Sequence, residues 1–307
     1  MDHQTIAREM NVSQSKIHDL QDCSMAFYLK HVLLLPDRPH WKTLVGSALH
    51  NVIEFCLKPR RRRVLDLILA NGFSFVANPS INRYCLMWRD HYHIDKWDHK
   101  NVEEMIALVF TTLKPYLIEG KFVSEQRFEE KIGDATVSGF LDVMTLGDDT
   151  RMFDMKTKGK KFTKAEIDDN IQAQMYAWYY HRKYGKLVPM HFIMTRFPPN
   201  KRDPSRHIQT VMPPTESQLR GLEIYLEHVY GVMNQFTLKD AYSHFHSDEG
   251  FCLRVCQMRL PFDYVSVKKK ITNKLVGNYL TDQVPKLKDD EYSEKARHSG
   301  CPKFNPQ

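Results

Sequence analysis

Residues 137–156, VSGFLDVMTLGDDTRMFDMK, decide the fold that this sequence predicts. Strand-forming residues flank Gly147-Asp148-Asp149, which are typical turn residues, so the stretch is predicted to form a β-hairpin. If the turn is symmetric about Asp148, Asp142 lies directly opposite Asp154, and Lys156 lies on the same face as Asp154. The other face is apolar and consists of Leu141, Val143, Phe153 and Met155.

The facing aspartates favour a metal site. Like charges directly opposite each other are unfavourable unless a positive group lies between them, and a divalent cation with oxygen ligands meets that need. The alternative is an ordinary solvated strand face on which Lys156 pairs with one carboxylate. The hairpin alone leaves both interpretations open.

Composition indicates a folded, basic protein. The chain has 307 residues, of which 42% are hydrophobic and 11% aromatic, enough for a large core. A net charge of +7 favours anionic partners, nucleic acid before a membrane surface. The sequence has no apolar run of membrane-span length and no signal peptide at its amino terminus. We therefore expect a soluble, intracellular protein with no membrane partner, in the cytoplasm or, if viral, in the host cell cytoplasm.

Helical and strand patterns surround the hairpin. We expect a serine-capped helix after Ser13 that includes Cys23, and a helix from Gly46 that carries His50. Further expected elements are a strand over residues 122–132 with Glu125 near its start, a helix from the Thr163–Glu166 capping box to Gly185, a strand over residues 188–197 and a helix after Thr215.

The predicted domain organisation is simple. We expect one domain over residues 1–265, with a helical insertion near residues 60–118. Residues 266–307 are polar and lysine-rich, which predicts a basic, flexible tail. The proline-rich loop over residues 197–207 carries Lys201, Arg202 and Arg206, and it is suited to following a phosphate backbone.

Five short motifs recur in a fixed order: Gly46-x3-His50, Glu125, Gly139-Phe-Leu-Asp142, Asp154-Met-Lys156-Thr157 and Gln172-x3-Tyr176. In order and spacing they resemble the RecB-like branch of the PD-(D/E)xK nuclease superfamily, which includes CRISPR-associated adaptation exonucleases and stand-alone phage exonucleases. The resemblance covers residues 13–197. It implies an α/β, restriction-endonuclease-like core, a mixed central sheet flanked by helices, with helical additions.

The resemblance also implies a metal site. His50, Asp142, Asp154 and the backbone carbonyl of Met155 would bind Mg²⁺ or Mn²⁺. Glu125 is either an outer ligand or a solvated carboxylate at the start of a strand.

The remaining motif residues are implied to act on the substrate. Lys156 would position the attacking water or stabilise the phosphate, while Gln172 and Tyr176 would hold this lysine and the nucleic-acid strand. The implied catalytic residues are Asp142, Asp154, Lys156, Gln172 and Tyr176. The implied nucleic-acid contacts are Gln172, Tyr176, Lys201, Arg202 and Arg206.

The function that these residues indicate is metal-dependent hydrolysis of DNA. We expect an exonuclease that acts on DNA ends or single strands in recombination, repair or replication, with DNA and other recombination or replication proteins as partners. The alternative is an inactive nucleic-acid-binding or assembly protein that keeps the fold. Such a protein has no chemical need of Asp142, Asp154 and Lys156, and all three are present.

The cysteines raise a separate question. Some members of this branch hold an iron–sulfur cluster on one early and three late, closely spaced cysteines. Cys23, Cys252 and Cys256 fit this arrangement, but the fourth candidate, Cys301, lies far downstream. The residues between them offer little apolar surface to hold a defined path, so we expect buried thiols and no cluster.

Overall fold

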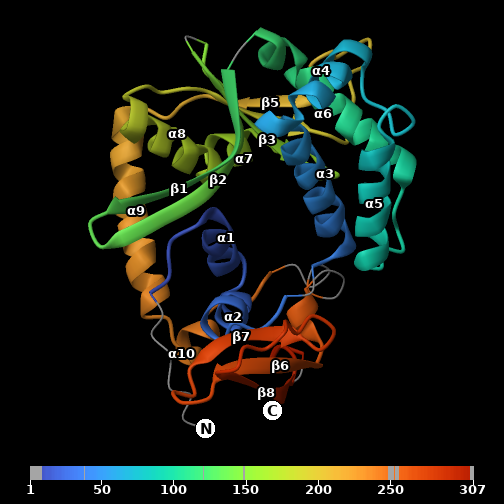
Figure 1. Ribbon diagram of the computed structural model, residues 1–307. Coiled ribbons are helices and arrows are strands. Elements are labelled where there is room, and N and C mark those ends of the chain that lie inside the picture. The colour runs from blue at the N-terminus through green and yellow to red at the C-terminus, as the bar shows by residue number, and fades with distance from the viewer. Residues whose placement is uncertain are drawn as a thin grey trace. The chain divides into compact units, whose positions relative to one another are not determined.

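The computed structural model describes residues 9–37, 39–119, 121–147, 149–247, 252 and 256–304 (Figure 1). It divides into two compact units, Trp41–Glu227 and Met1–His40 with His228–Gln307. This division differs from the single boundary expected at residue 265. No helix in the described part of the chain has the length and apolar character that a membrane span requires.

A five-stranded mixed sheet organises the unit Trp41–Glu227. The strands are β1 (Lys121–Ile132), β2 (Ala135–Leu146), β3 (Met152–Lys156), β4 (Met190–Met194) and β5 (Ile208–Val211), and they neighbour one another in that order. β3 and β4 are parallel, whereas the other neighbours are antiparallel. The expected α/β class with a mixed sheet and flanking helices is confirmed.

β2 and β3 form the predicted hairpin in the predicted register. Val143 pairs with Phe153, and Met144 pairs with Met152. Continued by one residue, this register brings Asp142 opposite Asp154. Asp148, the expected centre of the turn, lies outside the described residues.

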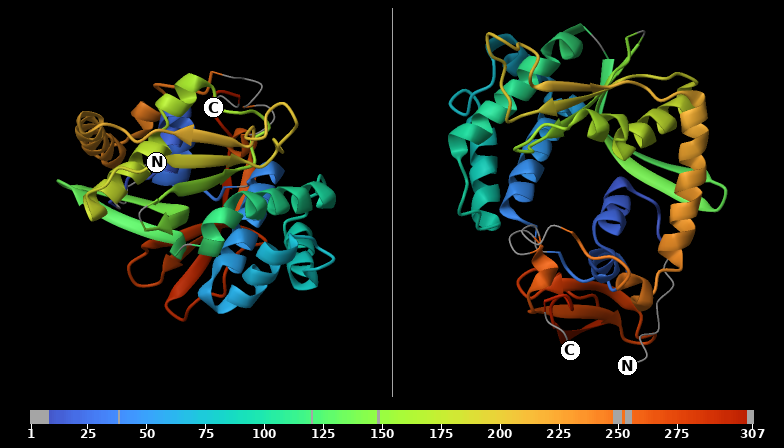
Figure 2. Two further views of the ribbon diagram at one scale, coloured as in Figure 1. Left: turned by 90° about the horizontal axis from the view of Figure 1, so that it is seen from above. Right: turned by 180° about the vertical axis from the view of Figure 1, so that it is seen from behind.

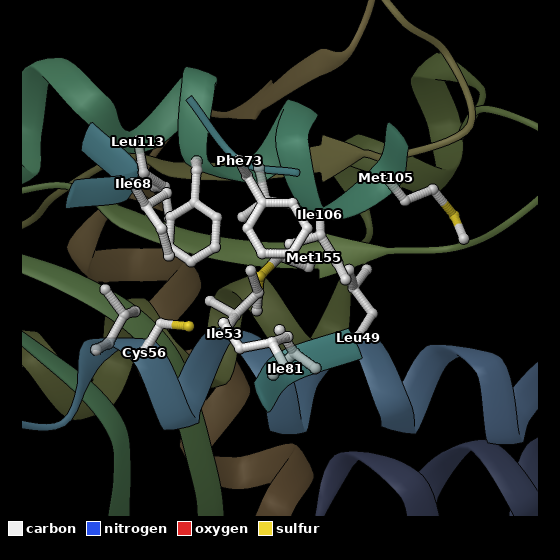
Figure 3. Close-up of a cluster of buried hydrophobic side chains, with 14 of the residues drawn as sticks. Leu49, Ile53, Cys56, Ile68, Phe73, Ile81, Met105, Ile106, Leu113 and Met155 are labelled. Carbon is white, nitrogen blue, oxygen red and sulfur yellow. The ribbon is translucent and has the colours of Figure 1, made fainter. Parts of the chain in front are cut away.

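Four helices pack an apolar layer against this sheet: α3 (Trp41–Leu57), α4 (Arg62–Asn71), α5 (Pro79–His91) and α6 (His99–Glu119). A 3-10 turn, Pro59–Arg61, precedes α4, and α4 to α6 lie in the region near residues 60–118 where a helical insertion was expected. Val143, Phe153 and Met155 belong to the same apolar cluster, and Figure 3 shows Met155 among side chains of α3 and α6. Because strand side chains alternate, Asp154 and Lys156 point away from this layer.

The segment after β3 contains two helices where one was predicted. The capping box forms, since Thr163 donates its backbone N–H to Glu166 Oε2 at 2.6 Å, but it caps only the short α7 (Lys164–Asp168). α8 (Ile171–Tyr184) begins behind a second cap, Asn170, whose side chain accepts from the Ala173 N–H at 3.0 Å. Asn170 has an extended backbone, φ −69° and ψ 102°, so the first helix ends before it and a second helix starts after it. Gly185 ends α8 in the left-handed conformation, as predicted.

The second unit begins with three short helical segments. They are α1 (Gln14–Asp22), α2 (Ser24–Phe27) and a π-helix, Tyr28–Val32. Cys23 has extended backbone angles, φ −161° and ψ 106°, so the predicted continuous helix through this residue is wrong. α10 (Leu238–Ala241) and a 3-10 turn, Gln257–Arg259, are further helical segments of this unit. α9 (Glu216–Asn234), which follows the predicted cap at Thr215, begins in the larger unit and ends in the smaller one.

The predicted flexible tail is replaced by a sheet. β6 (Phe262–Lys269), β7 (Leu275–Leu280) and β8 (Glu291–His298) are antiparallel in the order β7-β6-β8 (Figure 2). Val265 and Val267 are buried, whereas Lys268 pairs with Glu294 at 2.6 Å near the surface. Few residues of this region are apolar, which is why composition alone suggested a tail.

Gly139 of β2 is predicted to be required for packing. A Cβ atom there would lie 2.6 Å from Cε1 of Phe128, a buried ring that stacks on Tyr179 and meets Tyr176 edge-on. We expect Gly139→Ala to lower the free energy of unfolding by about 1–3 kcal/mol in chemical denaturation, because the ring is held by its neighbours. Gly221→Ala in α9, where a Cβ meets open space, is the control and should stabilise the protein by up to about 1 kcal/mol. Equal effects of the two substitutions would contradict the packing argument.

Candidate active site

His50 joins helix α3 to the hairpin. Its Nδ1 lies 3.2 Å from Oδ2 of Asp142, and its Nε2 lies 3.0 Å from the carbonyl oxygen of Met155. The same Asp142 oxygen accepts the Met155 backbone N–H at 3.1 Å. The structure therefore brings together three of the groups that the sequence predicts as metal ligands.

Charge compensation sets the protonation of this pair. Burial by itself lowers the pKa of His50, but the carboxylate of Asp142 more than offsets this effect and raises the pKa to about 9. In turn, burial raises the pKa of Asp142, and the His50 charge and hydrogen bonds bring it below its usual value. A positively charged imidazole thus lies beside the buried Asp142 carboxylate.

Glu125 of β1 lies beside Asp142. Its neighbours Ser124 and Gln126 pair with Val143 and Leu141, so Glu125 stands opposite Asp142 in the ladder. Its φ of 48° is left-handed, which costs a non-glycine residue roughly 1–2 kcal/mol. Burial and the nearby Asp142 charge raise the pKa of Glu125 to about 7.

Glu125 completes a group of donor atoms. One nitrogen or oxygen atom from each of His50, Glu125 and Asp142 lies within 4.8 Å of the others. The motif order gave Glu125 only an uncertain role, and the signal that identifies it is its register position opposite Asp142.

Asp154 is held in a separate ring of polar contacts, one ion pair and two hydrogen bonds. Lys156 Nζ lies 2.7 Å from Asp154 Oδ2 and donates to Gln172 Oε1 at 2.7 Å. Gln172 Nε2 donates to Asp154 Oδ1 at 2.6 Å, which closes the ring. Burial raises the pKa of Asp154 to about 6, and the nearby ammonium of Lys156 opposes this rise. Because an ammonium only donates, the Gln172 amide oxygen must face Lys156.

Tyr176 connects this ring of polar contacts to β2. It lies one helical turn after Gln172, and its hydroxyl accepts from Gln172 Nε2 at 2.9 Å and donates to the carbonyl of Phe140. Burial raises the pKa of Tyr176 well above its usual value, so the hydroxyl keeps its proton.

The donor set fits a hard divalent cation. It combines carboxylate oxygens, a nearby backbone carbonyl and, once His50 has lost its extra proton, an imidazole nitrogen, which suit Mg²⁺ or Mn²⁺. The predicted ligand set contained Asp154 and omitted Glu125. Here Asp154 contacts Lys156, and its buried Oδ2 accepts no hydrogen bond of good geometry among the described residues. A ligand role for Asp154 stays a prediction.

The predicted basic loop begins beside the site. Thr195 donates its backbone N–H to the Lys156 carbonyl at 3.0 Å, which ties the end of β4 to the end of β3. Further along, Lys201 and Arg202 are exposed, and the Arg206 guanidinium lies 5.7 Å from the centroid of Phe197.

Backbone contacts bring the cysteines of the smaller unit toward one another. Ser24, which follows Cys23, donates its N–H to the His244 carbonyl at 2.9 Å. Cys301 donates its N–H to the Arg259 carbonyl at 3.2 Å. These contacts bring both ends of the unit to the segment that contains Cys252 and Cys256.

The thiols are close enough to affect one another's ionisation. Burial raises the pKa of Cys301, and the Cys23, Cys256 and Cys252 thiols raise it further. We expected no cluster because the chain between Cys256 and Cys301 has few apolar residues to order it. That premise is wrong, because strands β6 to β8 order this part of the chain.

A sequence model of the PD-(D/E)XK nuclease superfamily matches residues 11–259. The chain belongs to this superfamily. Its members are metal-dependent phosphodiesterases, and the His50, Glu125 and Asp142 group could hold the ion that such chemistry requires.

Solved structures show only distant similarity. A crystal structure from Eubacterium rectale, described as a candidate exonuclease, is 12% identical, with a TM-score of 0.45 over 82% of this chain and 95% of that chain. SSO0001 is 14% identical (TM-score 0.26, 61% and 85% covered), and VC1899 from Vibrio cholerae is 12% identical (TM-score 0.23, 76% and 58% covered). These scores are too low to carry an argument. No curated protein sequence matches significantly.

Mn²⁺ binding is predicted to depend on Glu125. We expect Glu125→Gln to weaken Mn²⁺ binding about 10- to 100-fold in isothermal titration, because the substitution removes a charged oxygen from the donor group. Glu129→Gln is the matched control, since Glu129 is an exposed residue of the same strand that pairs with Arg127. Unchanged affinity in Glu125→Gln, or an equal loss in both variants, would exclude Glu125 from the site.

Proposed function

We propose that this protein is a metal-dependent deoxyribonuclease of the RecB-like branch, acting as an exonuclease on DNA ends or single strands. One observation carries the proposal. The donor group of His50, Glu125 and Asp142 and the ring of Lys156, Gln172 and Asp154 meet across one hairpin. Work on DNA ends in recombination, repair or replication, together with other proteins of those processes, is part of the same proposal.

The chain's own residues prepare the site for phosphate. A bound divalent ion supplies a Lewis acid that lowers the pKa of water and offsets phosphate charge. Lys156 is fixed by Asp154 and Gln172, so its ammonium is ready to donate to the attacking water or to a phosphate oxygen. Without Gln172 this long side chain would have to be ordered during the reaction, at an entropic cost.

Two basic loops support binding of a phosphate backbone. Phe162 is held to β5, because its N–H donates to Gln209 Oε1 at 3.0 Å and its carbonyl accepts from Gln209 Nε2 at 2.8 Å. Lys161 Nζ lies 5.9 Å and the Arg206 guanidinium 5.7 Å from the ring centroid of Phe197, so the two loops meet there. The basic residues of these loops are Lys158, Lys160, Lys161, Lys201, Arg202 and Arg206.

Clustered positive charge in these loops is evident at Lys158. Burial lowers the pKa of its ammonium, and the charges of Lys156 and Lys160 lower it further, against the opposing effect of Glu166. A polyanion relieves such repulsion, which supports a DNA strand as the occupant.

The proposal is tested with end-labelled single- and double-stranded DNA in Mg²⁺ or Mn²⁺. We expect a ladder of products that shortens from the ends and a closed circular single strand that resists cleavage.

Asp154→Ala should abolish hydrolysis, with a loss of at least about 1,000-fold, because Lys156 loses its buried counter-ion and the site loses a carboxylate. DNA affinity, measured by fluorescence anisotropy, should persist, since it comes from distributed phosphate contacts. Undiminished cleavage by Asp154→Ala would refute this assignment of the active site.

The cysteines form a second candidate site. The backbone hydrogen bonds of Ser24 and Cys301 to the two ends of the segment over residues 244–259 support a four-thiolate iron–sulfur site of Cys23, Cys252, Cys256 and Cys301, with Cys301 as the ligand from beyond the β6–β8 sheet.

Iron content tests this site independently of cleavage. Anaerobically purified protein should be brown and carry about two or four irons per chain, and Cys301→Ser should lose most of this iron. Cys85→Ser is the control, because Cys85 is a buried thiol of the apolar cluster in the other unit. Colourless, iron-free protein, or equal iron in wild type and Cys301→Ser, would exclude the cluster.

A further inference from the structure

Phe140 is an exposed ring beside buried site residues. Its side chain is 52% exposed, yet it lies two residues before Asp142, which is 8% exposed, on the same strand. Arg127 stands directly opposite it on β1, and the next pair on this face is Ser138 with Glu129. Single exposed apolar residues are ordinary on protein surfaces. The position of this ring, on a polar face next to the donor group, is what distinguishes it.

Hydrogen bonds fix the backbone of Phe140 relative to Lys156. The Phe140 carbonyl accepts from the Tyr176 hydroxyl, which accepts from Gln172 Nε2 at 2.9 Å. The other end of the Gln172 amide accepts from Lys156 at 2.7 Å. Because alternate residues of a strand share a face, the Phe140 and Asp142 side chains leave β2 on the same side, about 7 Å apart along the strand. This spacing is about the distance between neighbouring nucleotides.

We infer that Phe140 is a stacking platform for the unpaired base of the nucleotide next to the scissile phosphate. This inference rests on the proposed nuclease function and adds the form of DNA that reaches the site. A base within a duplex is already stacked and paired, whereas the base of a single strand or a frayed end can cover an exposed ring. Arg127, opposite the ring and paired with Glu129 at 2.7 Å, places a guanidinium on the same face. The enzyme thus selects an unpaired strand at the point of cleavage.

The experiment compares an intact single-stranded oligonucleotide with one that contains a single abasic residue, using wild type, Phe140→Leu and Phe140→Trp. In wild type, kcat/KM should fall about tenfold for cleavage where the abasic residue would lie on the ring. Phe140→Leu should lose about the same factor on the intact strand and show no further abasic effect, because the two changes remove one contact. Phe140→Trp should retain wild-type kcat/KM and abasic sensitivity, since indole also offers a face for stacking.

Tyr184→Leu is the matched control. Tyr184 is an exposed aromatic residue at the far end of α8, twelve residues or about 18 Å from Gln172 along the helix, and its loss should not change either rate. Circular dichroism and Mn²⁺ binding report whether each variant is folded. An abasic effect of equal size in wild type and Phe140→Leu would overturn the inference while leaving the nuclease intact. Absence of cleavage by wild type would instead refute the proposed function.

Discussion

Burial of two carboxylates on facing strands is the constraint on which the larger unit depends. Asp142 and Asp154 are 8% and 2% exposed, and a buried charge without compensation costs several kcal/mol. Each has its own cation, since His50 of α3 lies beside Asp142 and Lys156 lies beside Asp154. Gln172 of α8 closes the second pair, so charge compensation requires both helices to lie against the hairpin.

Core and site share one strand. Met155 buries its side chain in the apolar cluster of α3 to α6, while its carbonyl contacts His50 and its N–H donates to Asp142. Packing of that side chain therefore sets the position of the polar groups on either side of it. The precision that catalysis demands is supplied here by a strand buried on both faces rather than by a loop.

The smaller unit shows how distant segments are joined. The matched family region ends at residue 259, just before β6 begins at Phe262. The β6–β8 sheet brings the chain back so that the Cys301 backbone N–H donates to the carbonyl of Arg259, which is close to Cys256 in sequence. Loop-closure entropy grows only slowly with loop length, so an ordered sheet can bring such a late residue back at little additional cost.

The sequence by itself determined the hairpin, its register, the apolar and polar faces of β3 and the Gln172–Tyr176 pair, because these follow from side-chain periodicity and turn chemistry. Only the tertiary structure decided the place of Glu125, since its left-handed backbone and its position opposite Asp142 depend on the register in which β1 pairs with the next strand, β2. The same holds for Cys301 and for the β6–β8 sheet, whose pairing joins residues that local patterns treat separately. Local preferences are encoded within a few residues, whereas strand pairing and charge compensation depend on contacts that exist only after folding.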